Sequence, residues 1–133
     1  MSRTDAASSR PSDPRQTLGR AGEQLALAHL ERLGFALVAR NHRTRWGELD
    51  LVVFDGHTLV FVEVKTRRAS ARAGGPLDAI PATKRLQVRR MAAAWLTEEQ
   101  DRPRAVELRF DAVGVTVDER GALVRLDHIE GAF

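Results

Sequence analysis

Apolar and polar positions alternate most clearly in the middle of the chain, between residues 47 and 66. Two runs, Glu48–Phe54 and Thr58–Thr66, have the composition and the period of two that predict β-strands. Asp55-Gly56 separates them, and this dipeptide is favoured in the tight type I′ turn because both central residues need a positive φ. The pattern therefore predicts a β-hairpin with a two-residue turn, in which Phe54 faces His57 and Leu51 faces Val60.

This hairpin carries charged residues at positions that half-buried strands usually fill with apolar side chains. In the predicted register Asp50 faces Phe61, and Glu48 faces Glu63. Because alternate residues share one face of a strand, the three carboxylates and Lys65 are expected on the same side. Like charges opposite each other destabilise a strand pair, and buried carboxylates need partners or a metal. A divalent cation would supply that compensation, so the pattern indicates a metal site.

The remaining periodicity predicts a single domain over residues 17–133 with the element order αβββαββ, following a disordered tail over residues 1–16 that is rich in Ser, Pro, Arg and Asp. The expected elements outside the central hairpin are a helix Thr17–Leu33, a strand Phe35–Asn41, a helix Pro81–Glu98 and a second hairpin Val106–Val117 with Ala122–Asp127. A polar bend over residues 41–46 and a flexible basic loop over residues 67–76 connect them.

The first predicted helix offers a fourth carboxylate. Thr17 is suited to cap it and Gly34 to end it, while Gly19 and Gly22 suggest close packing against a sheet or a ligand. Glu23 lies on the side of these glycines. It is either a solvated helix residue or a carboxylate that reaches the acidic face of the hairpin. His29, later in this helix, is expected at the surface or at an edge.

The amino-acid composition limits the kinds of site that the chain can contain. The chain has 133 residues, of which 43% are hydrophobic, enough for the core of one domain. It has no cysteine, which excludes disulfides, thiolate zinc sites and cysteine nucleophiles. No apolar run approaches the length of a membrane span, and the N-terminus has no apolar export segment, so we expect no membrane partner and a cytoplasmic location.

The positive charge is almost entirely arginine. The net charge is +3, and of the 21 basic residues two, Lys65 and Lys84, are lysine. Lysine is a compact point charge with different chemistry from the planar guanidinium, and Lys65 falls in the triplet Glu63-Val64-Lys65. The basic excess is compatible with a polyanion partner.

Several basic residues lie near the predicted acidic face. Arg43 and Arg45 either hold phosphates or neutralise the carboxylates directly, and the basic loop is either a phosphate-contacting flap or an ordinary surface loop. The residues selected as nucleic-acid contacts are Arg43, Arg45, Arg67, Arg68, Lys84 and Arg85. Trp46 is expected to pack over the sheet, with stacking on a base as the alternative. Asp111 interrupts an apolar run, and pairing with an arginine is favoured over membership of the acidic site.

Asp50, followed after twelve residues by Glu63-Val64-Lys65 on paired strands, resembles the core of the PD-(D/E)XK nuclease motif, although Leu49 stands where the motif's name has proline. From Thr17 to Phe133 the chain closely resembles the YraN family of bacterial proteins, which is similar to archaeal Holliday-junction resolvases. The matching residues are Gly19-Arg20-Ala21-Gly22-Glu23, Asn41, Arg43, Gly47-Glu48-Leu49-Asp50-Leu51, Phe61-Val62-Glu63-Val64-Lys65, Arg67, Lys84, Arg109-Phe110-Asp111 and His128-Ile129-Glu130-Gly131-Ala132-Phe133.

The resemblance implies a restriction-endonuclease-like α/β core, a mixed central β-sheet flanked by helices. It also implies a metal-dependent endonuclease acting on DNA, with branched or junction DNA as the expected substrate and a homodimer as the expected assembly. Asp50, Glu63 and the Val64 carbonyl would bind Mg²⁺, with Mn²⁺ as a substitute, and Glu48 and a water-mediated Glu23 would complete the ligand set. Lys65 would orient or deprotonate the attacking water. The alternatives are a non-catalytic nucleic-acid-binding module and a protein-interaction scaffold.

Overall fold

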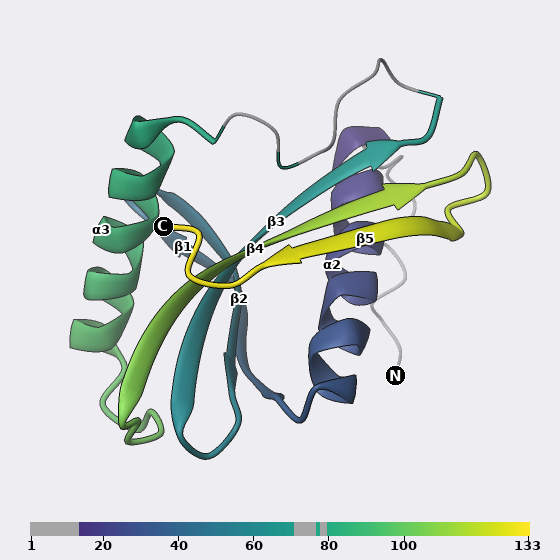
Figure 1. The fold of residues 1–133 in the computed structure, drawn as a ribbon. Coiled ribbons are helices and arrows are strands. Elements are labelled where there is room, and N and C mark those ends of the chain that lie inside the picture. The colour runs from purple at the N-terminus through teal and green to yellow at the C-terminus, as the bar shows by residue number, and fades with distance from the viewer. Residues whose placement is uncertain (1–13, 71–76, 78–79) are drawn as a thin grey trace, which may run out of the picture.

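The computed structural model describes residues 14–70, 77 and 80–133, and within them the elements follow the predicted order αβββαββ (Figure 1). The elements are α2 (Pro14–Arg32), β1 (Ala36–Thr44), β2 (Gly47–Phe54), β3 (Thr58–Arg68), α3 (Ala82–Glu98), β4 (Glu107–Val117) and β5 (Leu123–Ile129). The predicted α/β fold, with a mixed central sheet flanked by helices, is confirmed.

The strands form one five-stranded sheet in the order β1-β2-β3-β4-β5. All neighbouring pairs are antiparallel except β3 and β4, which are parallel over their full length. A parallel pair needs a crossover connection, and α3 supplies it. Glu48, Asp50 and Glu63 therefore lie on β2 and β3, two strands that each have a neighbouring strand on both sides.

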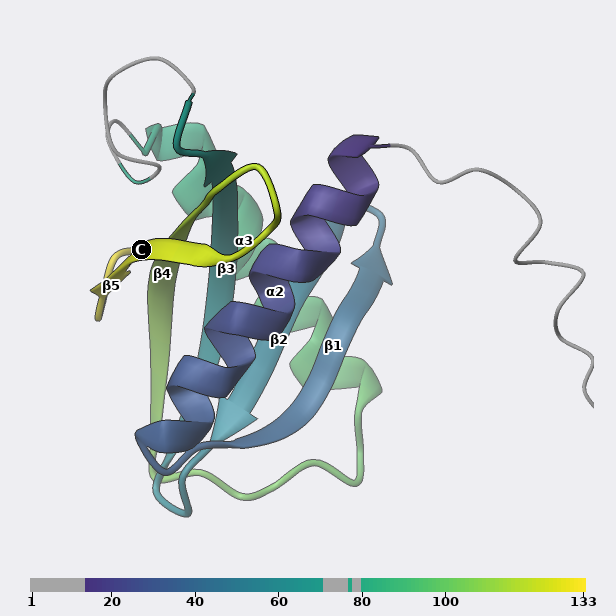
Figure 2. The ribbon, with the colours of Figure 1, turned by 90° about the vertical axis from the view of Figure 1, so that its right-hand side faces the viewer.

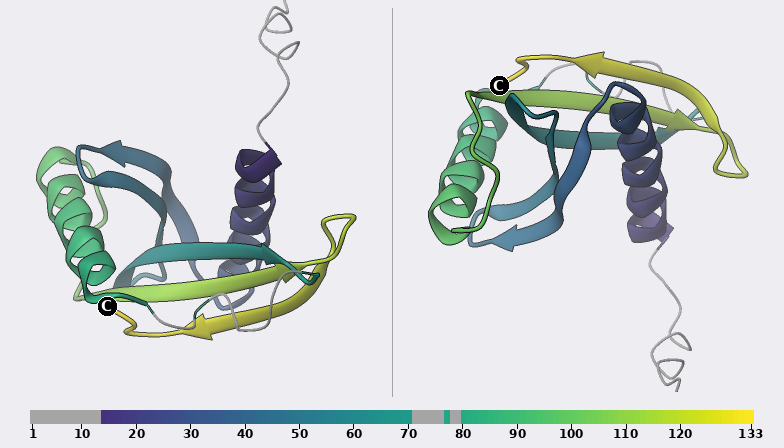
Figure 3. Two further views of the ribbon diagram at one scale, coloured as in Figure 1. Left: turned by 90° about the horizontal axis from the view of Figure 1, so that it is seen from above. Right: turned by 90° about the horizontal axis from the view of Figure 1, so that it is seen from below.

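Each helix covers a different part of the sheet, as the views along and across the strands show (Figures 2 and 3). Helix α2 packs on one face around a core that includes Leu30, Val62 and Val115. Helix α3 packs on the other face around Phe61 and Trp95, whose rings meet edge to face with centroids 5.8 Å apart. The two cores fix the helices relative to the strands between them.

Helix α2 approaches β3 closely at Gly22. A Cβ atom at this position would lie 2.7 Å from Cβ and from Cγ2 of Thr66, so only glycine fits without movement of the helix. The close packing predicted for this helix is thus confirmed at Gly22, whereas a Cβ at Gly19 would meet nothing within 4 Å. The contact brings the N-terminal half of α2, including Glu23, against the sheet.

The predicted turn of the central hairpin is wrong. Phe54 pairs with Leu59 and Leu51 with Val62, a register two residues away from the predicted one. The loop is longer because the Asp55 carboxylate accepts hydrogen bonds from the backbone N–H groups of His57 and Thr58, at 2.9 and 2.8 Å. A register shift of two residues does not by itself move a side chain to the other face, because the side-chain period of a strand is also two.

Other boundaries also differ from prediction. Helix α2 begins at Pro14, so Thr17 lies inside the helix and does not cap it, and residues 14–16 are helical. Strand β1 continues to Thr44 through most of the predicted polar bend, and Arg67 and Arg68 belong to β3 and not to a loop. The tail over residues 1–13 and the loop over residues 71–76 lie outside the described residues.

Candidate metal and nucleic-acid site

Three carboxylates from two distant parts of the chain meet beside the sheet. Glu23 of α2 and Glu48 and Asp50 of β2 each offer an oxygen, and these oxygens all lie within 4.8 Å of one another. Asn41 connects two of them, because its Nδ2 donates to Glu23 Oε1 at 2.8 Å and to Glu48 Oε1 at 3.2 Å. The grouping brings Glu23 to the acidic face of the hairpin, which the sequence alone left open.

Asp50 occupies the least favourable position for a carboxylate in this group. The pKa of Asp50 is raised to about 8, chiefly by burial and also by the negative charges of Glu63 and Glu23, against the opposing effects of a backbone hydrogen bond and of Lys84. The hydrogen bond comes from the Val64 N–H, which donates to Asp50 Oδ2 at 2.8 Å. The fold therefore holds Asp50 where an added positive charge would stabilise its ionised form.

Glu63 is engaged by a lysine from the crossover helix. Lys84 Nζ lies 3.0 Å from Glu63 Oε2, and only 13% of the Glu63 side chain is exposed. The structure thus places Lys84 in the acidic site, although the sequence placed it among outward-facing nucleic-acid contacts. Lys65, two residues beyond Glu63 on the same face of β3, is exposed and forms no hydrogen bond or ion pair with the residues that the structure describes.

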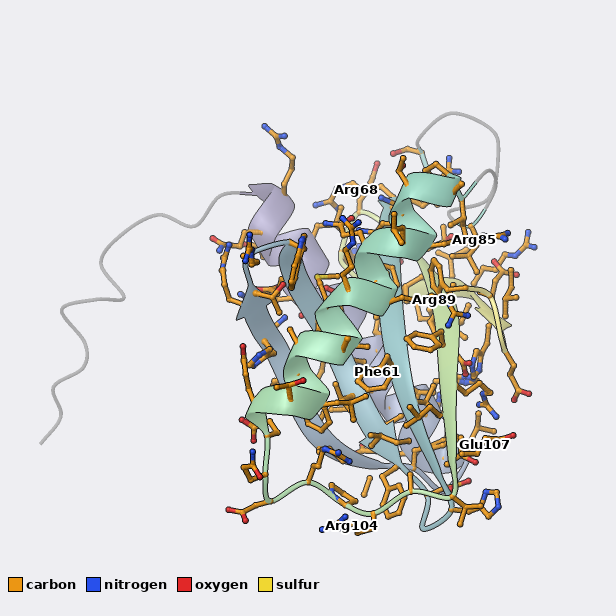
Figure 4. The ribbon with its side chains drawn as sticks, turned by 90° about the vertical axis from the view of Figure 1, so that its left-hand side faces the viewer. Phe61, Arg68, Arg85, Arg89, Arg104 and Glu107 are labelled. Atoms are coloured by element: carbon orange, nitrogen blue, oxygen red, sulfur yellow. The ribbon has the colours of Figure 1, made fainter. Side chains whose placement is uncertain are left out.

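The predicted arginine contacts spread over several elements. Arg43 lies 4.0 Å from Glu48, and the Arg45 guanidinium stacks over the indole of Trp46 at 5.0 Å from the ring centroid. Figure 4 shows Arg85 on the side of α3 that lies toward β4, and Arg68 on β3 near the start of the same helix. Of these residues, Arg43 is the one that the structure brings to the three-carboxylate group.

A shallow hollow of about 290 Å³ opens beside the carboxylates. It lies between the N-terminal half of α2 and the β1–β2 hairpin and is lined by Gln16, Gly19, Arg20, Glu23, Arg43 and Glu48. Arg20 also pairs with Glu23, at 3.4 Å. The hollow therefore has acids on one side and two guanidinium groups on its rim, an arrangement suited to a phosphate group beside a bound cation.

Asp111 belongs to a separate network. It is fully buried, and it accepts two hydrogen bonds from Arg109, both at 2.9 Å, one from the Gly131 N–H at 3.1 Å and one from His128 Nε2 at 2.8 Å. Burial alone would raise the pKa of Asp111, but these hydrogen bonds outweigh it and hold the pKa below its ordinary value. The favoured interpretation of Asp111, pairing with an arginine, is confirmed.

His29 lies at the edge of the sheet, which agrees with the expectation. Its Nε2 lies 3.0 Å from Nδ1 of His128 on the edge strand β5, so it is a partly buried member of the Asp111 network. Burial lowers the pKa of His29, and the nearby His128 and Arg32 lower it further. This partner lies ninety-nine residues away in the chain, so no local pattern indicates it.

Sequence reasoning assigned no role to two residues of the site. Asn41 bridges two of the acids, and it is the one non-glycine residue with a positive φ, 50°, among residues 14–70, 77 and 80–133. A polar asparagine in a predicted bend was the available signal, because asparagine tolerates this conformation. Arg20 lines the hollow, and its position one turn before Glu23 on a helix was the corresponding signal.

Comparison with known proteins confirms the resemblance to the YraN family. The family model described as "Uncharacterised protein family UPF0102" matches residues 22–115. A UPF0102 protein of Frankia casuarinae is 47% identical over 120 residues, covering 90% of this chain and 98% of the relative. A UPF0102 protein of Geobacter sulfurreducens is 47% identical over 116 residues, covering 87% of this chain and 88% of the relative. These names state no activity, so the function has to be argued from the site.

In the part of the chain that the structure describes, neither helix combines the length and the apolar character needed to cross a bilayer.

Proposed function

We propose that this chain, which belongs to the uncharacterised protein family UPF0102, is a metal-dependent endonuclease that hydrolyses phosphodiester bonds in DNA. The observation that carries the proposal is the meeting of Glu23, Glu48 and Asp50 within 4.8 Å. A fold gains no stability from crowding three carboxylates, so a cation that they bind together is the simplest reason for the arrangement.

The donor set fits Mg²⁺ or Mn²⁺. Both cations prefer hard oxygen ligands, and Mg²⁺ is bound by few carboxylates because it retains several waters. Asp50, Glu48 and Glu23 would hold the ion, and Glu63 would join them on release from Lys84. The Val64 carbonyl remains a predicted ligand. When bound, the ion would lower the pKa of a coordinated water and offset the charge that develops on the phosphate.

The two lysines would have different tasks. Lys65 is exposed beside Glu63 and would orient the attacking water or take its proton, because its Nζ has no partner among the described residues. Lys84 holds the Glu63 carboxylate and adds positive charge beside Asp50. Lys84 thus limits the repulsion between the carboxylates of the site.

The hollow beside the acids would receive the substrate. Arg20 and Arg43 lie on its rim, where their guanidinium groups can each donate two hydrogen bonds to a phosphate. Arg43 is 81% exposed, so it can exchange its long contact with Glu48 for a substrate phosphate at low cost. We propose branched or flapped DNA as the substrate, which is the substrate class that the family resemblance implies.

One observation favours a second candidate, a nucleic-acid-binding module without catalysis. The Lys84–Glu63 ion pair and a protonated Asp50 together reduce the charge of the site without a metal. Such a module would bind DNA equally well in Mg²⁺ and in chelator, and would release no product.

Calorimetric titration of Mg²⁺ and Mn²⁺ separates these candidates. We expect saturable binding to the wild type and none to Asp50→Asn, which keeps the shape of the side chain and loses its charge. Asp101→Asn is the matched control, because Asp101 is an exposed acid after α3, and it should bind the metal like the wild type. Equal metal binding by wild type and Asp50→Asn, or no binding by either, would overturn the proposal.

A further inference from the structure

A second hollow, of about 340 Å³, lies on the other side of the β1–β2 hairpin, against α3. Its walls are mainly apolar, and it is lined by Trp46, Arg90, Ala93, Ala94, Thr97 and Glu98. Two alanines on consecutive positions of α3 leave room in front of a partly exposed indole. The arrangement combines a flat aromatic wall with a small apolar floor.

Two hydrogen bonds hold the backbone of Trp46 in place. The Trp46 N–H donates to Thr44 Oγ1 at 3.1 Å, and Gln87 Nε2 of α3 donates to the Trp46 carbonyl. Gly47 allows this approach: its φ is 135°, and a Cβ there would lie 2.7 Å from Gln87 Nε2. The backbone that carries the indole is therefore positioned before any ligand binds, which reduces the entropy lost on binding.

The charges around the hollow indicate an anionic partner. Arg45 stacks on the Trp46 ring at 5.0 Å, and Arg90 lines the hollow itself, against the single acid Glu98. Glu98 also has a partner, His42, at 3.4 Å. A ligand with a flat π-face and a negative backbone matches an aromatic wall with two guanidinium groups beside it.

We propose that this hollow binds an unpaired nucleobase of a DNA strand whose phosphate lies at the three-carboxylate group. The inference rests on the proposed function: Trp46 lies in the turn between β1 and β2, and Glu48 of that group follows it by two residues, so one DNA strand that passes over this turn would reach both. A base within a duplex has both faces stacked and cannot enter, so the site selects DNA with an unpaired nucleotide beside the scissile bond.

Intrinsic fluorescence tests this directly. The chain has two tryptophans, and Trp95 is 2% exposed in the core, so a bound base can quench Trp46 alone. In EDTA, where no cleavage occurs, we expect a short oligothymidylate to quench the emission. An abasic oligomer of equal length and a blunt duplex should not. Trp46→Phe should show the unquenched emission of Trp95 and still bind the oligothymidylate.

Affinity measurements give the contribution of base stacking on Trp46 to binding. Base–aromatic stacking contributes about 1–3 kcal/mol, so Trp46→Leu should weaken oligothymidylate binding by about 5- to 150-fold in fluorescence anisotropy. Binding of the abasic oligomer should not change. Ala93→Gln, which fills the hollow with a neutral side chain but leaves the indole in place, should have the same effect, and it keeps the test decisive if Trp46→Leu folds poorly.

Two results would overturn the inference. The first is equal quenching by the oligothymidylate and the abasic oligomer, or no quenching by either. The second is a Trp46-dependent self-association in sedimentation, which would assign the hollow to a second copy of the chain. Because all these measurements are made in EDTA, they fail or succeed independently of metal binding and cleavage.

Discussion

Replacement of Asp50 by asparagine should stabilise the metal-free protein, although it removes the residue on which the proposed activity depends. Asparagine keeps the size of the side chain and an oxygen that can accept the hydrogen bond from the Val64 N–H. It removes the negative charge that burial, Glu63 and Glu23 all disfavour. The variant therefore relieves a cost that the wild type bears whenever Asp50 is ionised.

The size of the effect follows from the pKa of Asp50, which the fold raises from 3.8 to about 8. An acid with a raised pKa in the folded state favours folding less as the pH increases, because the unfolded chain gives up its proton first. At about 1.4 kcal/mol per pKa unit, the stability advantage of Asp50→Asn should grow from about 1–2 kcal/mol at pH 5 to about 6 kcal/mol at pH 9.

Urea denaturation of wild type, Asp50→Asn and Asp101→Asn at pH 5, 7 and 9 measures this advantage. Saturating Mg²⁺ at pH 9 should raise the unfolding free energy of the wild type and of Asp101→Asn, and should leave Asp50→Asn unchanged. An advantage that is constant from pH 5 to pH 9, or a loss of stability in Asp50→Asn at pH 9, would refute the reasoning about burial and repulsion.

Three further predictions test other parts of the structure. Gly22→Ala should destabilise the protein by about 1–3 kcal/mol in thermal or urea denaturation, because the new methyl group meets Thr66, whereas Gly19→Ala, with open space around it, should stabilise the helix by up to about 1 kcal/mol. Asp111→Asn should lower the unfolding free energy by about 3 kcal/mol in urea denaturation at pH 7, because it breaks a buried pair with Arg109. This difference should shrink as the pH falls below 3.8, since the pKa of Asp111 is lowered in the folded protein. Asp127→Asn, which breaks the exposed pair with Arg125, should lower it by less than about 1 kcal/mol. Mg²⁺ binding measured by calorimetry across a range of pH should reach half its maximum at a higher pH in Lys84→Met than in the wild type, because Lys84 lowers the pKa of Asp50. Arg85→Met, on the exposed side of α3, should leave this midpoint pH unchanged.

The element order and the faces of the strands could be predicted because they depend on local periodicity. The hairpin register could not, and Asp55 shows why. Asp-Gly favours a two-residue turn only when both residues adopt a positive φ, and here only Gly56 does, at 98°. The Asp55 side chain instead captures two backbone N–H groups, a competing use of the same residue that the dipeptide does not reveal.

Contacts between residues that are far apart in the sequence could not be predicted either. The spacing of Asp50 and Glu63 predicted an acidic face, but Glu23 beside Asp50 comes from α2, and Lys84 beside Glu63 comes from α3. Lys84 lies on the inner side of α3, one turn before the buried Val88, and pairs with Glu63 there, although Arg85, the next residue, is exposed. Side-chain pairs between distant elements depend on packing, so no local pattern of charge distinguishes such a lysine from a solvated one.

Cleavage of DNA tests the central claim most directly. Wild type, Asp50→Asn and Asp101→Asn would each be incubated in excess with end-labelled flapped, branched and linear duplex DNA, in Mg²⁺ and in EDTA. The proposed function predicts a product from flapped or branched DNA with wild type and Asp101→Asn in Mg²⁺ alone. It also predicts that Asp50→Asn binds the same DNA without cutting it. Wild type that binds all three DNAs equally in Mg²⁺ and EDTA and yields no product would contradict the claim and favour a binding module.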